Sequence, residues 1–346
     1  MRPRLESAPV AGGRSLSSGP MQRRSHRGHR RVAAALATLL GLLATAAPGA
    51  VAAPAPLGPT AGSAALTQAG RAARVAGYWT AARMRSARPL DLAVAAGAGG
   101  EPRLEVGAPG PEPVAGASFL AVSTPDVPPY SFNGRIFIRR GNLAGYCSGT
   151  AIDSPTRQLV LTAGHCLNSG HEDGERSVWS DYLQFVPAYD GGVAPFGAFV
   201  ARRGKVRAPR QWTNHGNPDF DIGAFLTLPN AAGVDLAEAV GGGATIATDL
   251  SRHQLFQTFG YPGASRFMQQ CSSPYTGDDL VSNPFPGPPT LGVRCHWAPG
   301  ASGGGWLIGD GTEINGINTY LHLNNESHTY SPYFSRETVG KLVRGF

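Results

Sequence analysis

The stretch Leu159-Val160-Leu161-Thr162-Ala163-Gly164-His165-Cys166 decides the fold, together with Tyr146-Cys147-Ser148-Gly149-Thr150-Ala151-Ile152 just before it. Both contain short apolar runs of the kind found in β-strands. The two cysteines lie 19 positions apart, and the second directly follows a histidine. A Cys147–Cys166 bridge would hold His165 at the end of a strand, as a general base must be held close to its nucleophile. No cysteine or histidine pair accompanies them at a zinc-binding spacing, so no metal site is predicted.

Strand-like runs recur from Phe132 to the end of the chain, with Gly, Asn and Pro between them. They lie at residues 135–139, 158–162, 182–186, 197–201, 222–228, 257–261, 304–308 and 314–320. Many short strands separated by turn signals predict an all-β sandwich or barrel. Helical periodicity is found only at residues 163–168, 234–240 and 336–343, and the last of these predicts a C-terminal helix.

A second informative segment is glycine-rich and contains a serine: Ala298-Pro299-Gly300-Ala301-Ser302-Gly303-Gly304-Gly305-Trp306. A nucleophilic serine needs an activating base and donors for the oxyanion that forms. Glycines let the backbone turn sharply and direct N–H groups at that charge. The backbone N–H groups of Gly300 and Ser302 are the candidate donors. The alternative interpretation is a glycine-rich hairpin loop without catalytic function.

The third segment, residues 217–226, places two acids before an apolar strand. An acid at the start of a buried strand can pack against an imidazole, fix its tautomer and stabilise the imidazolium. Asp221 directly precedes the apolar run and is the preferred candidate. Asp219, which follows Pro218, is the alternative and is more typical of a turn residue.

The order His165, Asp221, Ser302 and the motifs around these residues resemble those of the chymotrypsin-like serine peptidases. The resemblance covers about residues 130–346 and is strongest to secreted bacterial members related to the glutamyl endopeptidases. It implies two antiparallel six-stranded β-barrels with the triad in the cleft between them. It also implies that Ser302 is the nucleophile, His165 the base and Asp221 its orienting partner. The backbone N–H groups of Gly300 and Ser302 would then form the oxyanion hole.

Departures from the family pattern concern activation and specificity. Ala301 stands where many members carry an acid that pairs with a new N-terminal amine, so activation is expected to depend on removal of a pro-segment alone. His296 stands where trypsin-like members carry an acid, which argues against cleavage after Arg or Lys. Asn318 stands where glutamyl endopeptidases carry a pocket histidine, which argues against cleavage after Glu.

The strand after the serine supplies further candidate pocket residues. Thr319 is expected to hydrogen-bond Asp221, and Tyr320 and Leu321 to line the substrate groove. The candidate substrate-binding residues are His296, Asn318, Thr319 and Tyr320. Cys271 and Cys295 are expected to form a second disulfide, because the chain has an even number of cysteines and is predicted to be exported. No cofactor is predicted.

The net excess of positive charge lies entirely upstream of residue 116. The formal net charge is +7, and residues 1–52 alone carry eight arginines against one acid. Downstream of residue 115, acids slightly outnumber bases, so no basic surface is left for a phosphate backbone and nucleic-acid binding is excluded. Arginines before the apolar run 32–47 and the small residues 50–52 predict a secretory signal peptide over residues 1–52. A membrane anchor is the alternative, but the run is shorter than the ~20 residues that a spanning helix needs.

Residues 53–125, rich in Ala, Gly, Pro and Arg, predict a pro-segment that is removed or displaced, with a cut between residues 112 and 131. A disordered spacer is the alternative. Within it, residues 75–88 can form a short helix capped by Thr80 and ended by Pro89. Residues 126–346 form the predicted peptidase domain.

The sequence thus predicts a secreted, monomeric serine endopeptidase with polypeptide substrates and no stable membrane association after signal removal. Two other functions fit parts of the sequence. An inactive exported binding module could use the same fold. An α/β-hydrolase esterase also matches the G-x-S-x-G pattern at residues 300–304, but only 44 residues follow Ser302, too few for the strand–helix units that this fold requires.

Overall fold

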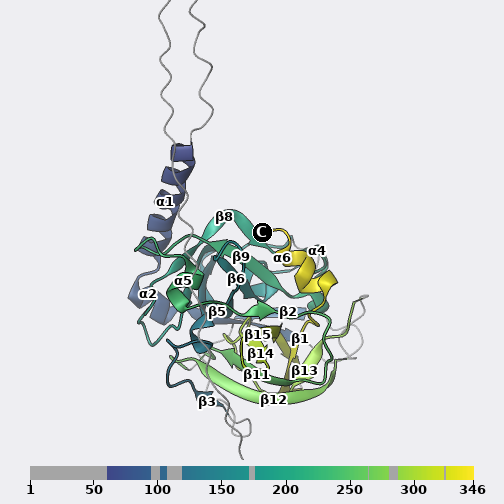
Figure 1. Cartoon of the computed structure of the whole chain (residues 1–346). Coiled ribbons are helices and arrows are strands. Elements are labelled where there is room, and N and C mark those ends of the chain that lie inside the picture. The colour runs from purple at the N-terminus through teal and green to yellow at the C-terminus, as the bar shows by residue number, and fades with distance from the viewer. Residues whose placement is uncertain are drawn as a thin grey trace, which may run out of the picture. The chain divides into compact units, whose positions relative to one another are not determined.

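A closed, six-stranded antiparallel barrel forms the first half of the β-structure (Figure 1). Its strands pair in the order β4-β5-β6-β9-β8-β7 and back to β4. They are β4 (Asn133–Arg140), β5 (Leu143–Ile152), β6 (Leu159–Thr162), β7 (Asp181–Pro187), β8 (Phe199–Arg207) and β9 (Gly223–Thr227). The computed structural model describes residues 61–94, 102–106, 119–170, 176–263, 265–279, 287–322 and 325–346. The predicted signal peptide lies outside these residues.

The second half is an antiparallel sheet in the order β15-β14-β11-β12-β13-β17-β16. Its strands are β11 (Leu255–Gly260), β12 (Gln269–Asp278), β13 (Leu291–Val293), β14 (Gly305–Ile308), β15 (Glu313–Ile317), β16 (Tyr320–His322) and β17 (Asn325–Ser331). The first and last strands of this order, β15 and β16, are consecutive in the chain, so the sheet curls back toward itself. The prediction of an all-β, chymotrypsin-like fold is confirmed: of the two six-stranded antiparallel barrels that were predicted, one is present as a closed barrel, and further strands lie outside it.

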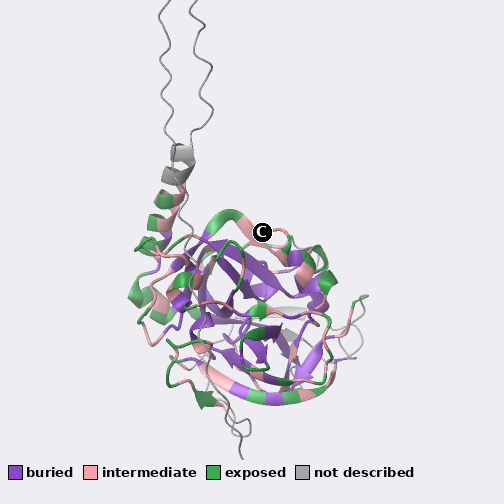
Figure 2. Ribbon diagram, viewed as in Figure 1, coloured by how far each residue is buried: buried purple, intermediate pink, exposed green. Residues whose placement is uncertain are grey.

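Most strands of both halves consist largely of buried residues (Figure 2). The largest buried cluster includes Ile136, Phe185 and Phe225 of the first barrel and extends to Phe259 and Ile317 of the second sheet. A second cluster in the other sheet includes the Cys271–Cys295 pair and Trp306. The candidate catalytic residues lie next to these strands: His165 after β6, Asp221 before β9 and Ser302 before β14.

Short helices and small strands connect these elements. They are β3 (Leu120–Ala121), η1 (Tyr130–Phe132), α3 (Gly164–Leu167), α4 (Arg210–His215), η2 (Pro218–Phe220), α5 (Leu236–Val240) and β10 (Thr245–Ile246). The predicted C-terminal helix is present as a π-helical turn, η3 (Arg336–Gly340), followed by α6 (Lys341–Val343). Ser335 and Thr338 form a capping box at its start. No helix within the described ranges is both long and apolar enough to cross a membrane.

The described part of the region predicted as a pro-segment contains β3 and, before it, two helices and two further strands: α1 (Ala61–Tyr78), α2 (Ala81–Ser86), β1 (Arg88–Val94) and β2 (Pro102–Val106). The helix expected over residues 75–88 is thus divided at Trp79. Thr80 accepts a hydrogen bond from the backbone N–H of Arg83 and caps α2, as predicted. Strand β1 pairs with β2, β5 and β16, so this region is part of the folded structure.

Candidate active site

His165 and Asp221 form a fully buried pair between β6 and β9. The backbone N–H of His165 donates to Asp221 Oδ1 at 2.7 Å, and Nδ1 of its ring lies 2.7 Å from Asp221 Oδ2. An ionised carboxylate can only accept hydrogen bonds, so this contact places the ring proton on Nδ1 and leaves the lone pair on Nε2. The two contacts fix both the position and the tautomer of the imidazole, which is what a general base requires.

The local sequence explains how Asp221 reaches this position. The side chain of Asn217 accepts a hydrogen bond from the backbone N–H of Asp219 and begins the 3-10 turn η2, with Pro218 in its first position. Asp221 ends this turn directly before β9. Trp212 packs beside the His165 ring, with 6.3 Å between the ring centroids. Asp221 is therefore held inside a rigid turn rather than in an exposed loop.

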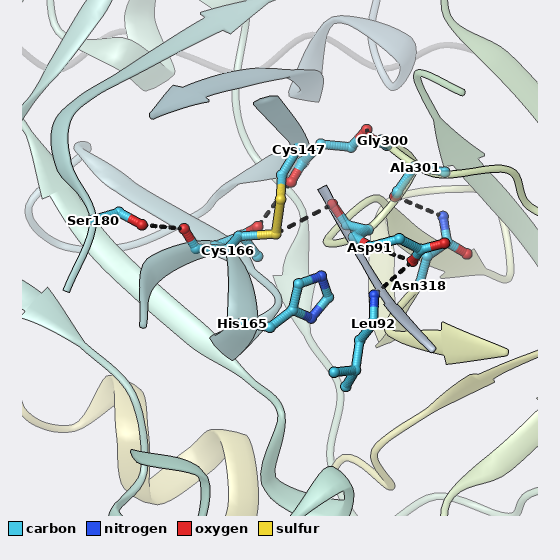
Figure 3. The surroundings of a disulfide bond; sticks show 12 residues. Asp91, Leu92, Cys147, His165, Cys166, Ser180, Gly300, Ala301 and Asn318 are labelled. Atoms are coloured by element: carbon cyan, nitrogen blue, oxygen red, sulfur yellow. Dashed lines mark hydrogen bonds between the residues drawn. A yellow bond between two sulfur atoms is a disulfide. The ribbon is translucent and has the colours of Figure 1, made fainter. Parts of the chain in front are cut away.

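The Cys147–Cys166 disulfide joins β5 to α3 beside the histidine (Figure 3). Arg140 Nη2 donates to the carbonyl oxygen of His165 at 2.6 Å, and the hydroxyl of Ser180 donates to that of Cys166 at 2.9 Å. The helical turn that carries His165 is thus fixed by one covalent bond and two side-chain hydrogen bonds. Cys271 and Cys295 form the second disulfide.

The serine loop is clamped against the first barrel. The Ser148 backbone N–H donates to the carbonyl of Ser302 at 2.8 Å, and the Ser148 hydroxyl donates to that of Gly300 at 2.9 Å. Gly300 has φ of 98°, and a Cβ there would lie 2.5 Å from the Tyr146 ring. Gly303 has φ of 84°, and a Cβ there would meet the Thr162 hydroxyl. Glycine is therefore required at both positions for the loop to lie so close to the barrel.

Within the described part of the chain, the Ser302 hydroxyl makes no hydrogen bond to a histidine. It donates to Asp91 Oδ1 of strand β1 at 2.9 Å. His165 Nε2 is buried and has no hydrogen-bond partner among the described residues. The Gly300 backbone N–H donates to the carbonyl of Leu90 at 3.0 Å. Sequence reasoning missed Asp91, although the alternation Leu90-Asp91-Leu92 after Pro89 was a strand-like signal in that region.

A small pocket beside Ser302 is lined by three of the four predicted pocket residues. Asn318, Thr319 and Tyr320 line it together with Asp91, Trp297, Ala298, Ala301, Leu321 and Thr329, whereas His296 does not. The amide of Asn318 donates to the carbonyls of Phe259 and Ala301 and accepts from Trp306 Nε1. The Asn318 side chain therefore holds the serine loop in place through the carbonyl of Ala301.

The other two pocket residues are also hydrogen-bonded to the protein. The Thr319 hydroxyl donates to the carbonyl of Tyr330 at 2.7 Å, so the expectation that it bonds Asp221 is wrong. Tyr320 donates to Asp279 Oδ2 at 2.6 Å, and His322 Nε2 lies 2.9 Å from the same oxygen. Tyr320 is thus held at the groove by a buried polar network.

Asp219, the alternative acid, is buried near Asp279, and the contacts of the His165 backbone N–H and of its Nδ1 go to Asp221 rather than to Asp219. Burial raises the pKa of Asp219 from its ordinary value of 3.8 to about 7, and the charge of Asp279 adds to this effect while Arg252 opposes it. The geometry thus assigns the contact with His165 to Asp221.

This pKa gives a prediction for pH-dependent stability. Because the folded protein holds the Asp219 proton more tightly than the unfolded chain does, the stability contributed by this group is present below about pH 4 and is lost as the pH rises through about 7. Asp219→Asn is therefore expected to raise the unfolding free energy at pH 8 by about 1–2 kcal/mol, and to change it little at pH 4. Thermal unfolding of both proteins from pH 4 to 8 measures this, and parallel pH profiles would contradict it.

One set of three metal-ligand types lies together in the described part of the chain: Cys147, His165 and Cys166. Both sulfur atoms belong to the disulfide and are not thiolates, while a zinc ligand set requires thiolate sulfur. These residues therefore do not form a metal site.

Similar folds are found among solved protease structures. The protease Anisep from Arthrobacter nicotinovorans is 31% identical, with a TM-score of 0.52, over 59% of this chain and 90% of that chain. The thermostable serine protease AL20 from an extremophilic microorganism is 28% identical, with a TM-score of 0.51, over 59% of this chain and 92% of that chain.

A Glu endopeptidase is 18% identical, with a TM-score of 0.52, over 66% of this chain and 95% of that chain, and shows a likeness of fold alone. No protein-family model and no curated protein matches the sequence. The solved structures nevertheless agree with the barrel architecture and with the resemblance carried by the motifs around His165, Asp221 and Ser302. The chain belongs to the chymotrypsin-like serine proteases.

Proposed function

We propose that this protein is a secreted serine endopeptidase that hydrolyses peptide bonds through His165, Asp221 and Ser302. The observation that carries the proposal is the buried His165–Asp221 pair, with two contacts of 2.7 Å that leave Nε2 as a base. The hydrogen bond from the Ser148 backbone N–H to the Ser302 carbonyl fixes the serine loop against the barrel that carries this pair.

The proposed reaction has two stages. Ser302 Oγ attacks the carbonyl carbon of the peptide while His165 Nε2 takes its proton, and the N–H groups of Gly300 and Ser302 stabilise the oxyanion. His165 then gives the proton to the leaving amine, and an acyl-enzyme remains. Water, activated by His165, hydrolyses this ester and restores Ser302. Asp221 orients the imidazole and stabilises its protonated form throughout.

The N-terminal regions have separate roles in this proposal. Residues 1–52 direct export, which permits both disulfides to form. Residues 53–125 are a pro-segment, because Ser302 must exchange its hydrogen bond to Asp91 for one to His165 before it can react. The mature protein is a monomer that acts on polypeptides, with Tyr320 and its neighbours lining the groove.

A covalent serine reagent tests the proposal. A fluorophosphonate probe applied to material cut between residues 112 and 131 and then freed of the N-terminal segment is expected to modify Ser302, as identified by peptide mass spectrometry. Modification should fall at least 10³-fold in His165→Ala, because the nucleophile then lacks its base. Absence of labelling in protein from which the N-terminal segment has been removed would favour an inactive binding module on the same fold.

A further inference from the structure

Strand β1 crosses the candidate site and pairs with both halves of the protein. Pro89 pairs with Tyr146 of β5, and Leu92 pairs with Tyr320 of β16, both in parallel register. Figure 3 shows Asp91 and Leu92 on this strand near His165 and the loop that carries Gly300. The strand therefore occupies the groove in which an extended substrate is expected to lie.

Each reactive group of the site is affected by this strand. Asp91 Oδ1 accepts the Ser302 hydroxyl and the Leu92 backbone N–H, each at 2.9 Å. The carbonyl of Leu90 accepts from Gly300, one of the two candidate oxyanion donors. His165 Nε2 has no hydrogen-bond partner within the described ranges. The nucleophile is thus bonded away from its base, and an oxyanion donor is already used.

We propose that residues 88–94 form an autoinhibitory strand in which the Asp91 carboxyl group withholds Ser302 from His165. The inference rests on the proposed peptidase function, and it assigns to this chain its own cleft-binding inhibitor. The carboxyl group competes well for the serine proton, because hydrogen bonds to carboxylates are roughly twice as strong as those between neutral groups.

The strand is bound as an inhibitor rather than as a substrate. The group that meets Ser302 Oγ is a side-chain carboxyl, which is not electrophilic, and Asp91 is the β1 residue that lines the pocket beside the serine. The carbonyl of Leu90 accepts the hydrogen bond from Gly300, but its side chain does not line this pocket and packs against Gly145 in the first barrel. Attack on that carbonyl would require Ser302 to leave Asp91 and bond His165. Strand β1 is therefore expected to remain uncut.

Apolar contacts hold the strand in place. Leu92 is buried against Trp212, Phe220 and Tyr320. Trp79, upstream of the strand, is also buried: its Nε1 donates to the carbonyl of Tyr182, and its ring packs 5.3 Å from that of Phe137. These contacts do not depend on the covalent link through residues 107–118. Cutting that link should therefore leave the site closed, so activation needs a cut and then departure of the segment.

The experiment uses the full secreted chain with a site-specific protease sequence placed between residues 107 and 118. After cutting, size-exclusion chromatography at decreasing concentration measures retention of the N-terminal segment, and a fluorophosphonate probe measures the reactivity of Ser302. The cut wild-type chain is expected to retain the segment and to label as slowly as the uncut chain. Asp91→Ala is expected to raise the dissociation constant of the segment about 10- to 100-fold, the factor attributed to a hydrogen bond with a charged group, and to speed labelling accordingly.

Two further variants make the result decisive. Trp79→Ala should release the segment after the cut and give rapid labelling, whereas Arg74→Ala, at an exposed position of α1, should behave as the wild type. If Asp91→Ala does not fold, Asp91→Asn, which keeps a neutral acceptor, should give an intermediate dissociation constant.

Equal retention of the Asp91 variants and the wild type would overturn the proposal, as would rapid labelling with the segment bound or self-cleavage between Leu90 and Asp91. A third outcome separates this proposal from the proposed function. If retention of the segment depends on Asp91 but the probe labels neither the closed nor the opened protein, the peptidase function is rejected and the docking of the segment still stands.

Discussion

Ser302→Ala is expected to lower kcat for peptide hydrolysis by about 10⁶-fold, with little change in KM. The substitution removes the attacking oxygen, and the residual rate comes from binding and from the oxyanion donors alone. The hydrogen bonds that hold the loop against Ser148 use the backbone carbonyls of Ser302 and Gly300, not the Ser302 hydroxyl. The fold should therefore be preserved. Hydrolysis of a peptide library by the processed enzyme measures the effect.

The sample for this test must be freed of residues 53–125, since an inactive variant has no means of processing itself. Cutting by an added site-specific protease followed by removal of the segment gives the same starting material for all variants. Ser251→Ala, at an exposed serine in the second half of the chain, is the matched control and should retain wild-type activity. A Ser302→Ala enzyme within 10-fold of wild type would reject Ser302 as the nucleophile.

Asp221→Asn is expected to lower kcat by about 10⁴-fold at neutral pH. An amide in place of the carboxylate removes the charge that stabilises the imidazolium. The N–H group of the Asn side chain can then donate to His165 Nδ1, which places the ring proton on Nε2 and leaves no base facing Ser302. The loss should appear in kcat and kcat/KM together, because Asp221 is fully buried behind His165 and no substrate contact is altered. Steady-state kinetics on the processed enzyme measures it.

Asp219→Asn is the matched control for this experiment, and it separates the two acids that the sequence offered. It makes the same Asp-to-Asn change at a carboxylate two residues before Asp221. This variant should keep kcat within a few-fold of wild type and should change stability with pH as described above. A large loss of kcat in Asp219→Asn with an active Asp221→Asn would reverse the assignment of the orienting acid.

The parts of the fold and candidate site that were predictable have local causes in the sequence. Residues 146–166 combine apolar strand signals with two cysteines and a histidine, so the strand, the disulfide and the position of His165 follow from one stretch. Asp221 was distinguished from Asp219 by its place directly before an apolar run. The glycines around Ser302 are required by positive φ angles and by backbone packing against the barrel.

The parts that were missed depend on long-range pairing. Strand β12 (Gln269–Asp278) contains few apolar residues, because its side chains are mostly half-buried or exposed. It is a strand because β11 and β13 pair with it. Strand β1 contains Pro89 and lies in a region rich in Ala, Gly and Pro. The alternation Leu90-Asp91-Leu92 is a weak strand signal, but nothing in it indicates pairing with β5 and β16. The contact of Asp91 with Ser302 spans 211 positions in the sequence, and composition carries no information on such a contact.

The pairing of β1 with both β5 and β16 also bears on aggregation. A strand that leaves a sheet exposes a row of unpaired N–H and C=O groups, and such an open edge is a template for any extended chain. A peptidase groove needs these free edges for its substrates, yet the same edges could join one newly made copy to another. Because β1 covers these edges within the same molecule, two copies of the chain are not expected to join through them while the segment stays bound.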